Sequence, residues 1–131
     1  MISSFSVRRN FVVRQSFAAF AGKIGPRELF KEFTVQPCSP DLKKELGVER
    51  WGVWSTAGSS KYKVGVKSPL KVYDGNELSY IISGKMTITP DEGPNKGIPV
   101  PVQAGDFVFF PDGFSCYWFV EETVTKHYYL W

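Results

Sequence analysis

Glu77-Leu-Ser-Tyr-Ile-Ile-Ser-Gly84 is the stretch of sequence that decides the fold, together with Gly105-Asp-Phe-Val-Phe-Phe-Pro-Asp-Gly113. In the first stretch, six residues separate an acid from a glycine. In the second, an apolar run lies between a glycine and a Pro-x-Gly turn. Glycine permits positive φ and proline fixes a turn, so each stretch is expected to be a short strand bounded by a fixed turn.

Short β segments with frequent turn residues continue on both sides of these two stretches. The expected strands cover residues 51–56, 61–66, 69–73, 77–83, 85–89, 98–103, 106–110, 115–120 and 125–131. Many short strands with almost no helix predict an all-β sandwich or jelly roll. Continuous apolar runs at 80–82 and 107–110 indicate strands covered on both faces, whereas Met86 and Ile88 alternate onto one face. A tight turn is predicted at residues 83–85 and a long loop at residues 91–97.

The region before these strands is expected to be a short helical or irregular extension. Residues 28–37 are compatible with a helix or a strand. Ser39 is placed to cap a short helix over Leu42 to Leu46, which Gly47 ends.

At 131 residues the chain is long enough for one domain with a real core. No apolar run approaches the ~20 residues that cross a bilayer, so no membrane association is expected. Cys38 and Cys116 are the only cysteines. Two cysteines do not form a disulfide framework, so a reducing compartment is favoured.

The first 27 residues carry five basic and no acidic residues, whereas the remainder carries 11 basic and 13 acidic ones. A basic, Ser- and Phe-containing segment without acids is typical of a transit peptide, so we expect residues 1–27 to be a leader and residues 29–131 the mature domain. The composition does not separate a plastid leader from a mitochondrial one, and both compartments stay open at this point. An ordinary basic N-terminal helix is the competing interpretation. Without the leader the domain is slightly acidic, so direct binding of nucleic acid is not expected.

The ordered set of motifs from Leu46 to Trp131 resembles the small single-domain cupins of the (S)-ureidoglycine aminohydrolase-like family. The resemblance rests on Trp51-Gly-Val-Trp54, Tyr73-Asp-Gly-Asn-Glu77, the two opening stretches, Cys116-Tyr-Trp118 and Thr125-Lys-His-Tyr128. It implies an RmlC-like cupin jelly-roll barrel. With the leader, the chain is most similar to plastid-targeted plant members, one group of which is associated with the transcriptionally active chromosome.

The resemblance also locates the positions at which metal-binding cupins carry histidine. Counted from Glu77 and Gly113, these positions hold Lys71, Tyr73 and Cys116, and the chain has one histidine in total, His127. A lysine ammonium repels cations, and the remaining donors suit no common metal together. We therefore expect no metal and no cofactor.

The pocket candidates are Lys71, Tyr73, Glu77, Cys116, Trp118 and His127. Lys71 and Glu77, on neighbouring strands, can form a buried or half-buried pair in which each tunes the pKa of the other. A thiolate at Cys116 acting with His127 is a conceivable catalytic pair. In the alternative, Cys116 is a small core residue and His127 faces solvent. Most of the aromatic rings are expected to fill the barrel or form a dimer contact.

Three function classes follow. The first is a ligand-binding or assembly component of a plastid, with a small molecule, a second copy of the chain or nucleoid proteins as partners. The second is a small-molecule enzyme that acts on a ureide, amide or carboxylate without the histidine triad. The third, disfavoured by the missing histidines, is a metal-dependent aminohydrolase. No catalytic residue is assigned.

Overall fold

The computed structural model describes residues 26–131 and consists mainly of antiparallel β-strands. The predicted leader, residues 1–27, lies outside the described residues apart from Pro26 and Arg27. The elements in chain order are α2 (Pro26–Leu29), β1 (Thr34–Pro37), α3 (Pro40–Glu45), the 3₁₀ helix η2 (Val48–Arg50), β2 (Gly52–Ser55), β3 (Lys71–Val72), β4 (Glu77–Pro90), β5 (Val100–Gln103), β6 (Asp106–Phe110) and β7 (Ser115–Leu130). None of the helices in residues 26–131 has the length and apolar character to cross a membrane.

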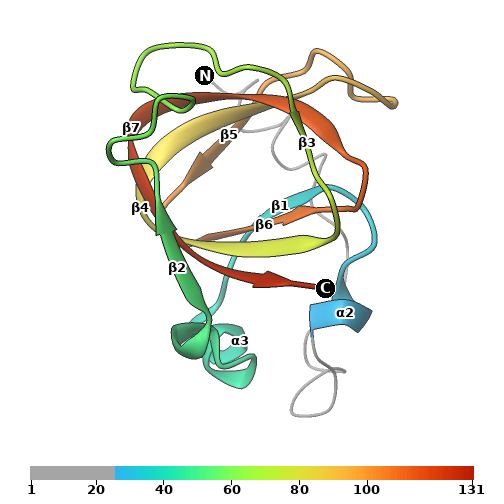
Figure 1. Ribbon diagram of the computed structural model, residues 1–131. Helices are drawn as coiled ribbons and strands as arrows, with labels where there is room; N and C mark the ends of the chain where they lie inside the picture. Colours follow the sequence, from blue (N-terminus) through green and yellow to red (C-terminus); the bar gives the residue numbers. More distant parts are fainter. Residues whose placement is uncertain (1–25) are drawn as a thin grey trace.

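Two long strands, β4 and β7, hold the barrel together. They pair along most of their length, then curve at one edge so that each contributes to both layers (Figure 1). The strand order is β1-β6-β4-β7-β2, with β3 added to β7 and β5 added to β4. This arrangement confirms the predicted jelly-roll barrel.

The predicted tight turn at residues 83–85 is wrong, because β4 bends there without ending. The strand continues through this region, and its register with β7 shifts between Ile81 and Met86. Gly84 has φ +100°, and a Cβ built on it would lie 2.1 Å from the carbonyl oxygen of Thr123. The glycine therefore permits a bulge and a close approach of two strands, not a hairpin. For the same reason the predicted strands 115–120 and 125–131 are one strand.

The predicted strand over residues 61–66 is also wrong. The hydroxyl oxygen of Ser59 accepts hydrogen bonds from the backbone N–H groups of Lys61 and Tyr62, both at 3.1 Å, and Gly65 has φ +80°. A side-chain turn followed by a left-handed glycine interrupts the extended backbone. Of the predicted strand 69–73, only Lys71–Val72 is extended in the sheet.

The N-terminal extension contains both structures that the sequence allowed. Residues 26–29 form a helix and residues 34–37 a strand that pairs with β6. Ser39 caps α3 through the backbone N–H of Leu42 at 3.1 Å, and Gly47 follows the helix with φ +65°, as predicted.

Two apolar cores lie on opposite faces of β6. Val108 and Phe110 point into the barrel, whereas Phe107 and Phe109 pack against the N-terminal extension. All five residues of the strand are buried, which confirms that this apolar run is covered on both faces. Met86 and Ile88 both lie in the barrel core, as their alternation predicted, but Ile82 is exposed.

Candidate functional site

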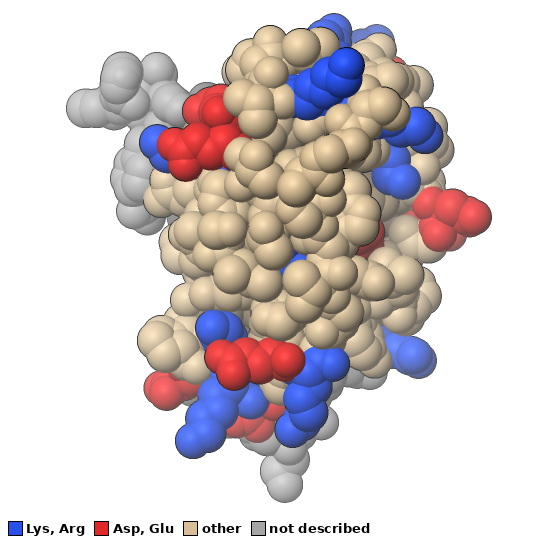
Figure 2. Space-filling model, turned by 60° about the vertical axis from the view of Figure 1, so that its left-hand side comes forward, with Lys and Arg blue, Asp and Glu red and all other residues tan. Residues whose placement is uncertain are grey.

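A cavity of about 310 Å³ opens into the barrel. Its wall is largely aromatic and carries three lysines and one carboxylate. The lining residues are Trp54, Lys61, Tyr62, Lys71, Tyr73, Glu77, Trp118, Lys126, Tyr128 and Leu130. Charged side chains are otherwise gathered at the two ends of the face shown in Figure 2 and leave its middle mostly uncharged. The cavity wall thus combines aromatic rings with three lysines and one carboxylate.

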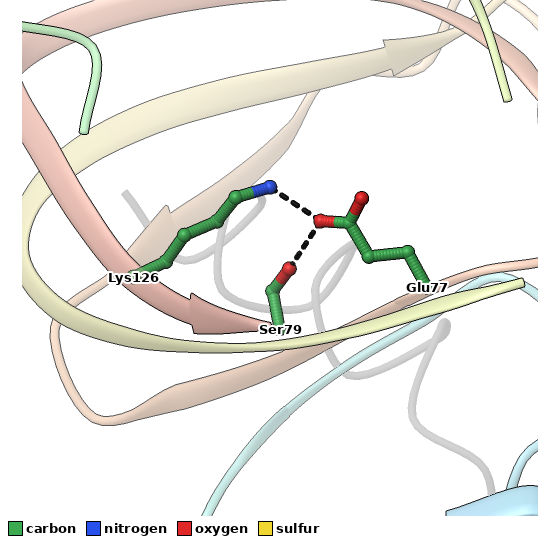
Figure 3. Close-up of polar contacts among 3 residues, drawn as sticks. All are labelled: Glu77, Ser79 and Lys126. Carbon is green, nitrogen blue, oxygen red and sulfur yellow. Dashed lines mark hydrogen bonds and ion pairs between the residues drawn. The ribbon is translucent and has the colours of Figure 1, made fainter. Parts of the chain in front are cut away.

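An ion pair between Lys126 and Glu77 lies on the cavity wall (Figure 3). The ammonium of Lys126, on β7, donates a hydrogen bond to Oε2 of Glu77, at the start of β4. The hydroxyl of Ser79 donates to the same oxygen at 2.6 Å. The side chains of Lys126 and Glu77 are only 6% and 15% exposed. Two donor side chains, one from each of two paired strands, therefore fix one carboxylate oxygen of Glu77.

Aromatic rings surround the ammonium of Lys126. Its Nζ lies 5.1 Å from the ring centres of Trp54 and Trp118 and 5.9 Å from that of Phe110. These distances are typical of cation–π interactions, which compensate part of the lost hydration. Burial lowers the pKa of Lys126, and the ion pair with Glu77 opposes this effect.

Two buried polar groups on the cavity wall lack a hydrogen-bond partner within residues 26–131. They are the hydroxyl of Tyr73 and the indole N–H of Trp118, on side chains 5% and 2% exposed. Trp118 lies near enough to Tyr73 to counteract part of the pKa rise that burial imposes on this phenol, but the two groups do not meet in hydrogen-bond geometry. Buried polar groups are usually bonded, so each unpaired donor points to a missing acceptor.

Lys71 lines the cavity but does not form the predicted pair with Glu77. Its strand, β3, pairs with the beginning of β7, where Lys71 faces Cys116, and its Nζ lies 4.8 Å from the centre of the Tyr73 ring. Lys126 comes from the other half of β7, which pairs with the beginning of β4. The pair with Glu77 is therefore made by a lysine that the sequence analysis did not consider.

Cys116 and His127 lie on opposite faces of β7. Cys116 is completely buried in the barrel core, and burial raises the pKa of its thiol to about 12, so the thiol is neutral. His127 lies between two cavity residues, Lys126 and Tyr128, so strand alternation points it to the outer face. The two residues cannot act together on one ligand.

Of the six candidate residues, the cavity contains Lys71, Tyr73, Glu77 and Trp118. The candidate list left out the remaining lining residues. Alternation along β7 could have found two of them, because Lys126 and Tyr128 follow Trp118 at even spacing. Lys61 and Tyr62 come from the connection between β2 and β3, which has no periodic signal.

The side chains present do not fit the metal that the histidine positions of other cupins hold. In the part of the chain that the structure describes, no three His, Cys, Asp or Glu side chains are grouped to bind an ion. Glu77 is instead engaged by Lys126 and Ser79.

A curved antiparallel barrel with a polar cavity inside it is the architecture of a cupin. The sequence matches the model of the EutQ-like cupin domain over residues 43–128, and the chain therefore belongs to this family. The match confirms the predicted cupin fold. No curated protein sequence matches the chain significantly.

Solved structures are similar to this chain. A DUF861 family protein from Thermotoga maritima is 35% identical, with a TM-score of 0.63, over 76% of this chain and 100% of its own. The Clostridium difficile EutQ protein is 18% identical, with a TM-score of 0.44, over 73% of this chain and 66% of its own. An RmlC-like cupin from Shewanella frigidimarina is 17% identical, with a TM-score of 0.39, over 50% and 55%.

Proposed function

We propose that this cupin binds a small organic anion, a carboxylate or a ureide-type acid, in the barrel cavity. The observation that carries the proposal is the pair of buried donors, the Tyr73 hydroxyl and the Trp118 indole N–H, which lack acceptors within residues 26–131. An indole N–H only donates, so its missing partner must be an acceptor. Both polar atoms are buried behind the cavity wall, so a ligand oxygen would reach them only after a small movement of the rings, and pairing would then remove a penalty of about 1–3 kcal/mol for each group.

The charge of the cavity supports an anionic ligand. Lys126 is neutralised by Glu77, which leaves the positive charges of Lys71 and Lys61 on the wall. A volume of about 310 Å³ lies at the lower end of small-molecule sites, so the ligand is of metabolite size. The aromatic rings of Trp54 and Tyr62 can cover its apolar part.

Binding can be tested by tryptophan fluorescence, because Trp54 and Trp118 line the cavity. The full chain is titrated with small carboxylates and ureido acids, with the matching amides and alcohols as neutral controls. We expect a saturable change with acids only. Tyr73→Phe removes one donor without changing the ring and should weaken binding about tenfold, equivalent to ~1.4 kcal/mol. A signal equal for acids and neutral controls, or none for the whole panel, would contradict the proposal.

The second candidate function is catalysis on a ureide, amide or carboxylate, related to that of (S)-ureidoglycine aminohydrolase but without its metal. The observation that favours it is the Lys126–Glu77 pair on the cavity wall, because a coupled amine and carboxylate can exchange a proton. Release of ammonia from ureidoglycine, with Glu77→Gln as the matched control, tests it. Turnover that survives this substitution would rule out the role of the pair.

We further propose that the protein works in a plastid, with the mitochondrion as the alternative, as part of a nucleoid-associated assembly or as a homodimer. The acid-free, basic composition of residues 1–27 supports import. Fusion of residues 1–27 to a fluorescent protein should direct it to plastids, and the mature protein should begin near residues 20–28. A mature N-terminus at Met1 or Ile2 would exclude the leader.

A further inference from the structure

We infer that Lys126 is a nucleophile that forms an imine with the carbonyl carbon of a small oxo acid held in the cavity. This inference rests on the proposed anion binding and adds to it the class of ligand, an aldehyde acid or an α-keto acid. It gives the Lys126–Glu77 pair a chemical role beyond stabilising the barrel.

The position of Lys126 fits this role. Its amine lies on the cavity wall, although the residue as a whole is only 5% exposed. The three surrounding rings limit the access of water to the amine, which slows the hydrolysis of an imine formed there. Burial also lowers the pKa of Lys126, which favours the neutral amine that attacks a carbonyl.

Glu77 is placed to act as the general base and then the general acid of the reaction. Its Oε2 contacts the amine directly, and the Ser79 hydroxyl at 2.6 Å holds this oxygen in place. The carboxylate takes one proton from the ammonium, so that the free amine forms a C–N bond with the carbonyl carbon. One proton of the attacking amine moves to the former carbonyl oxygen to give the carbinolamine, and the proton held by Glu77 then lets this oxygen leave as water. The product is a protonated imine, with the Glu77 carboxylate as its counter-ion, and one water is released for each imine formed.

The other cavity lysines do not share this arrangement. Lys71 is half-buried beside the Tyr73 ring and, within the described chain, has no carboxylate partner to accept its proton. Lys61 is exposed at the cavity rim. They are suited to hold the carboxylate of an oxo acid while Lys126 reaches its carbonyl group. The Tyr73 hydroxyl and the Trp118 indole are further donors for these oxygens.

Reductive trapping with glyoxylate tests the inference on the full chain. Glyoxylate is the smallest aldehyde acid, and cyanoborohydride delivers hydride to its imine to leave a stable carboxymethyl group on the amine. We expect peptide mapping to place this group on Lys126 at least tenfold faster than on any exposed lysine. Glycolate, which has the same carboxylate but no carbonyl, should protect Lys126 by competition. Glu77→Gln should slow trapping about tenfold or more.

Control variants keep the test decisive. Lys126→Arg retains a cation in the cavity but cannot form the imine, so it should fold and give no trapped product at this position. Lys71→Met should weaken glycolate binding while trapping at saturating glyoxylate persists. If glycolate still changes the tryptophan fluorescence but glyoxylate labels only exposed lysines, the imine inference is wrong and the binding proposal survives. If neither acid perturbs the cavity, the proposed function itself fails.

Discussion

The ion pair between Lys126 and Glu77 predicts a specific pattern of stability changes. Removing either partner alone leaves the other charge buried, with its side chain at most 15% exposed. Lys126→Met and Glu77→Gln should therefore each cost about 3–5 kcal/mol. Proton release limits the cost of Glu77→Gln, because discharging a lysine of ordinary pKa at pH 7 requires about 4.6 kcal/mol. The double variant leaves no charge and should cost less than either single variant.

Urea denaturation of the four proteins at pH 7, followed by tryptophan fluorescence, measures this pattern. With a slope of ~2 kcal/mol per molar urea, each single variant should lose about 1.5–2.5 M in its midpoint. The double-mutant cycle should give a coupling energy of several kcal/mol. Additive shifts below ~0.5 kcal/mol would refute the reasoning, because they would mean that the two side chains do not meet in a desolvated environment.

The pH dependence provides a second check on the same pair. Burial lowers the pKa of Lys126, so at alkaline pH the unfolded chain binds more protons than the folded chain. Stability from this residue should rise as the pH increases from the folded pKa toward the unfolded value of ~10.4. Lys126→Met should lack that rise. A contribution that instead falls over this interval would show that pairing outweighs burial.

Three further predictions concern other parts of the molecule. Gly84→Ala should cost more than ~2 kcal/mol, because positive φ is combined with a clash at Thr123, whereas Gly105→Ala, at φ +92° with open space, should cost distinctly less in the same urea assay. Cys116, with its pKa raised to about 12, should resist iodoacetamide at pH 8 until the protein unfolds; rapid native labelling would contradict its burial. The domain without residues 1–27 should show no tight, salt-sensitive band shift with DNA, since it carries 13 acidic and 11 basic residues.

The sequence was informative wherever local chemistry determines local geometry. Ser39 and Gly47 bound a helix because capping and left-handed φ act within a few residues. The apolar run at 107–110 identified a strand buried on both faces because each face needs its own apolar partners. Glycine at position 84 correctly indicated positive φ, but a bulge and a turn require the same conformation, and the sequence could not separate them.

The site was less predictable because its ion pair joins residues 49 positions apart. Glu77 was a candidate, but the identity of its partner depends on which half of β7 lies beside Glu77. The bend in β4 and β7 determines this pairing, and the bend is not visible in the local sequence. Lys71 carries the same charge as Lys126, but its strand pairs with the first half of β7, where Lys71 faces Cys116 and not Glu77. Lys61 and Tyr62 enter the cavity from a connection shaped by the hydroxyl of Ser59, so no strand period could place them.

The origin of the cavity wall has a consequence for protein engineering. Glu77, Ser79 and Lys126 are carried by the two strands that pair along the whole barrel, whereas Lys61 and Tyr62 belong to the irregular connection between β2 and β3. Libraries confined to this connection could therefore change the cavity wall while the Lys126–Glu77 ion pair keeps its geometry. Substitutions on β4 or β7 would have to satisfy the sheet and the site at once. Part of the cavity wall can therefore be varied without altering the strands that carry the ion pair, whereas Trp118 and Tyr128 share β7 with Lys126 and cannot be varied independently of it.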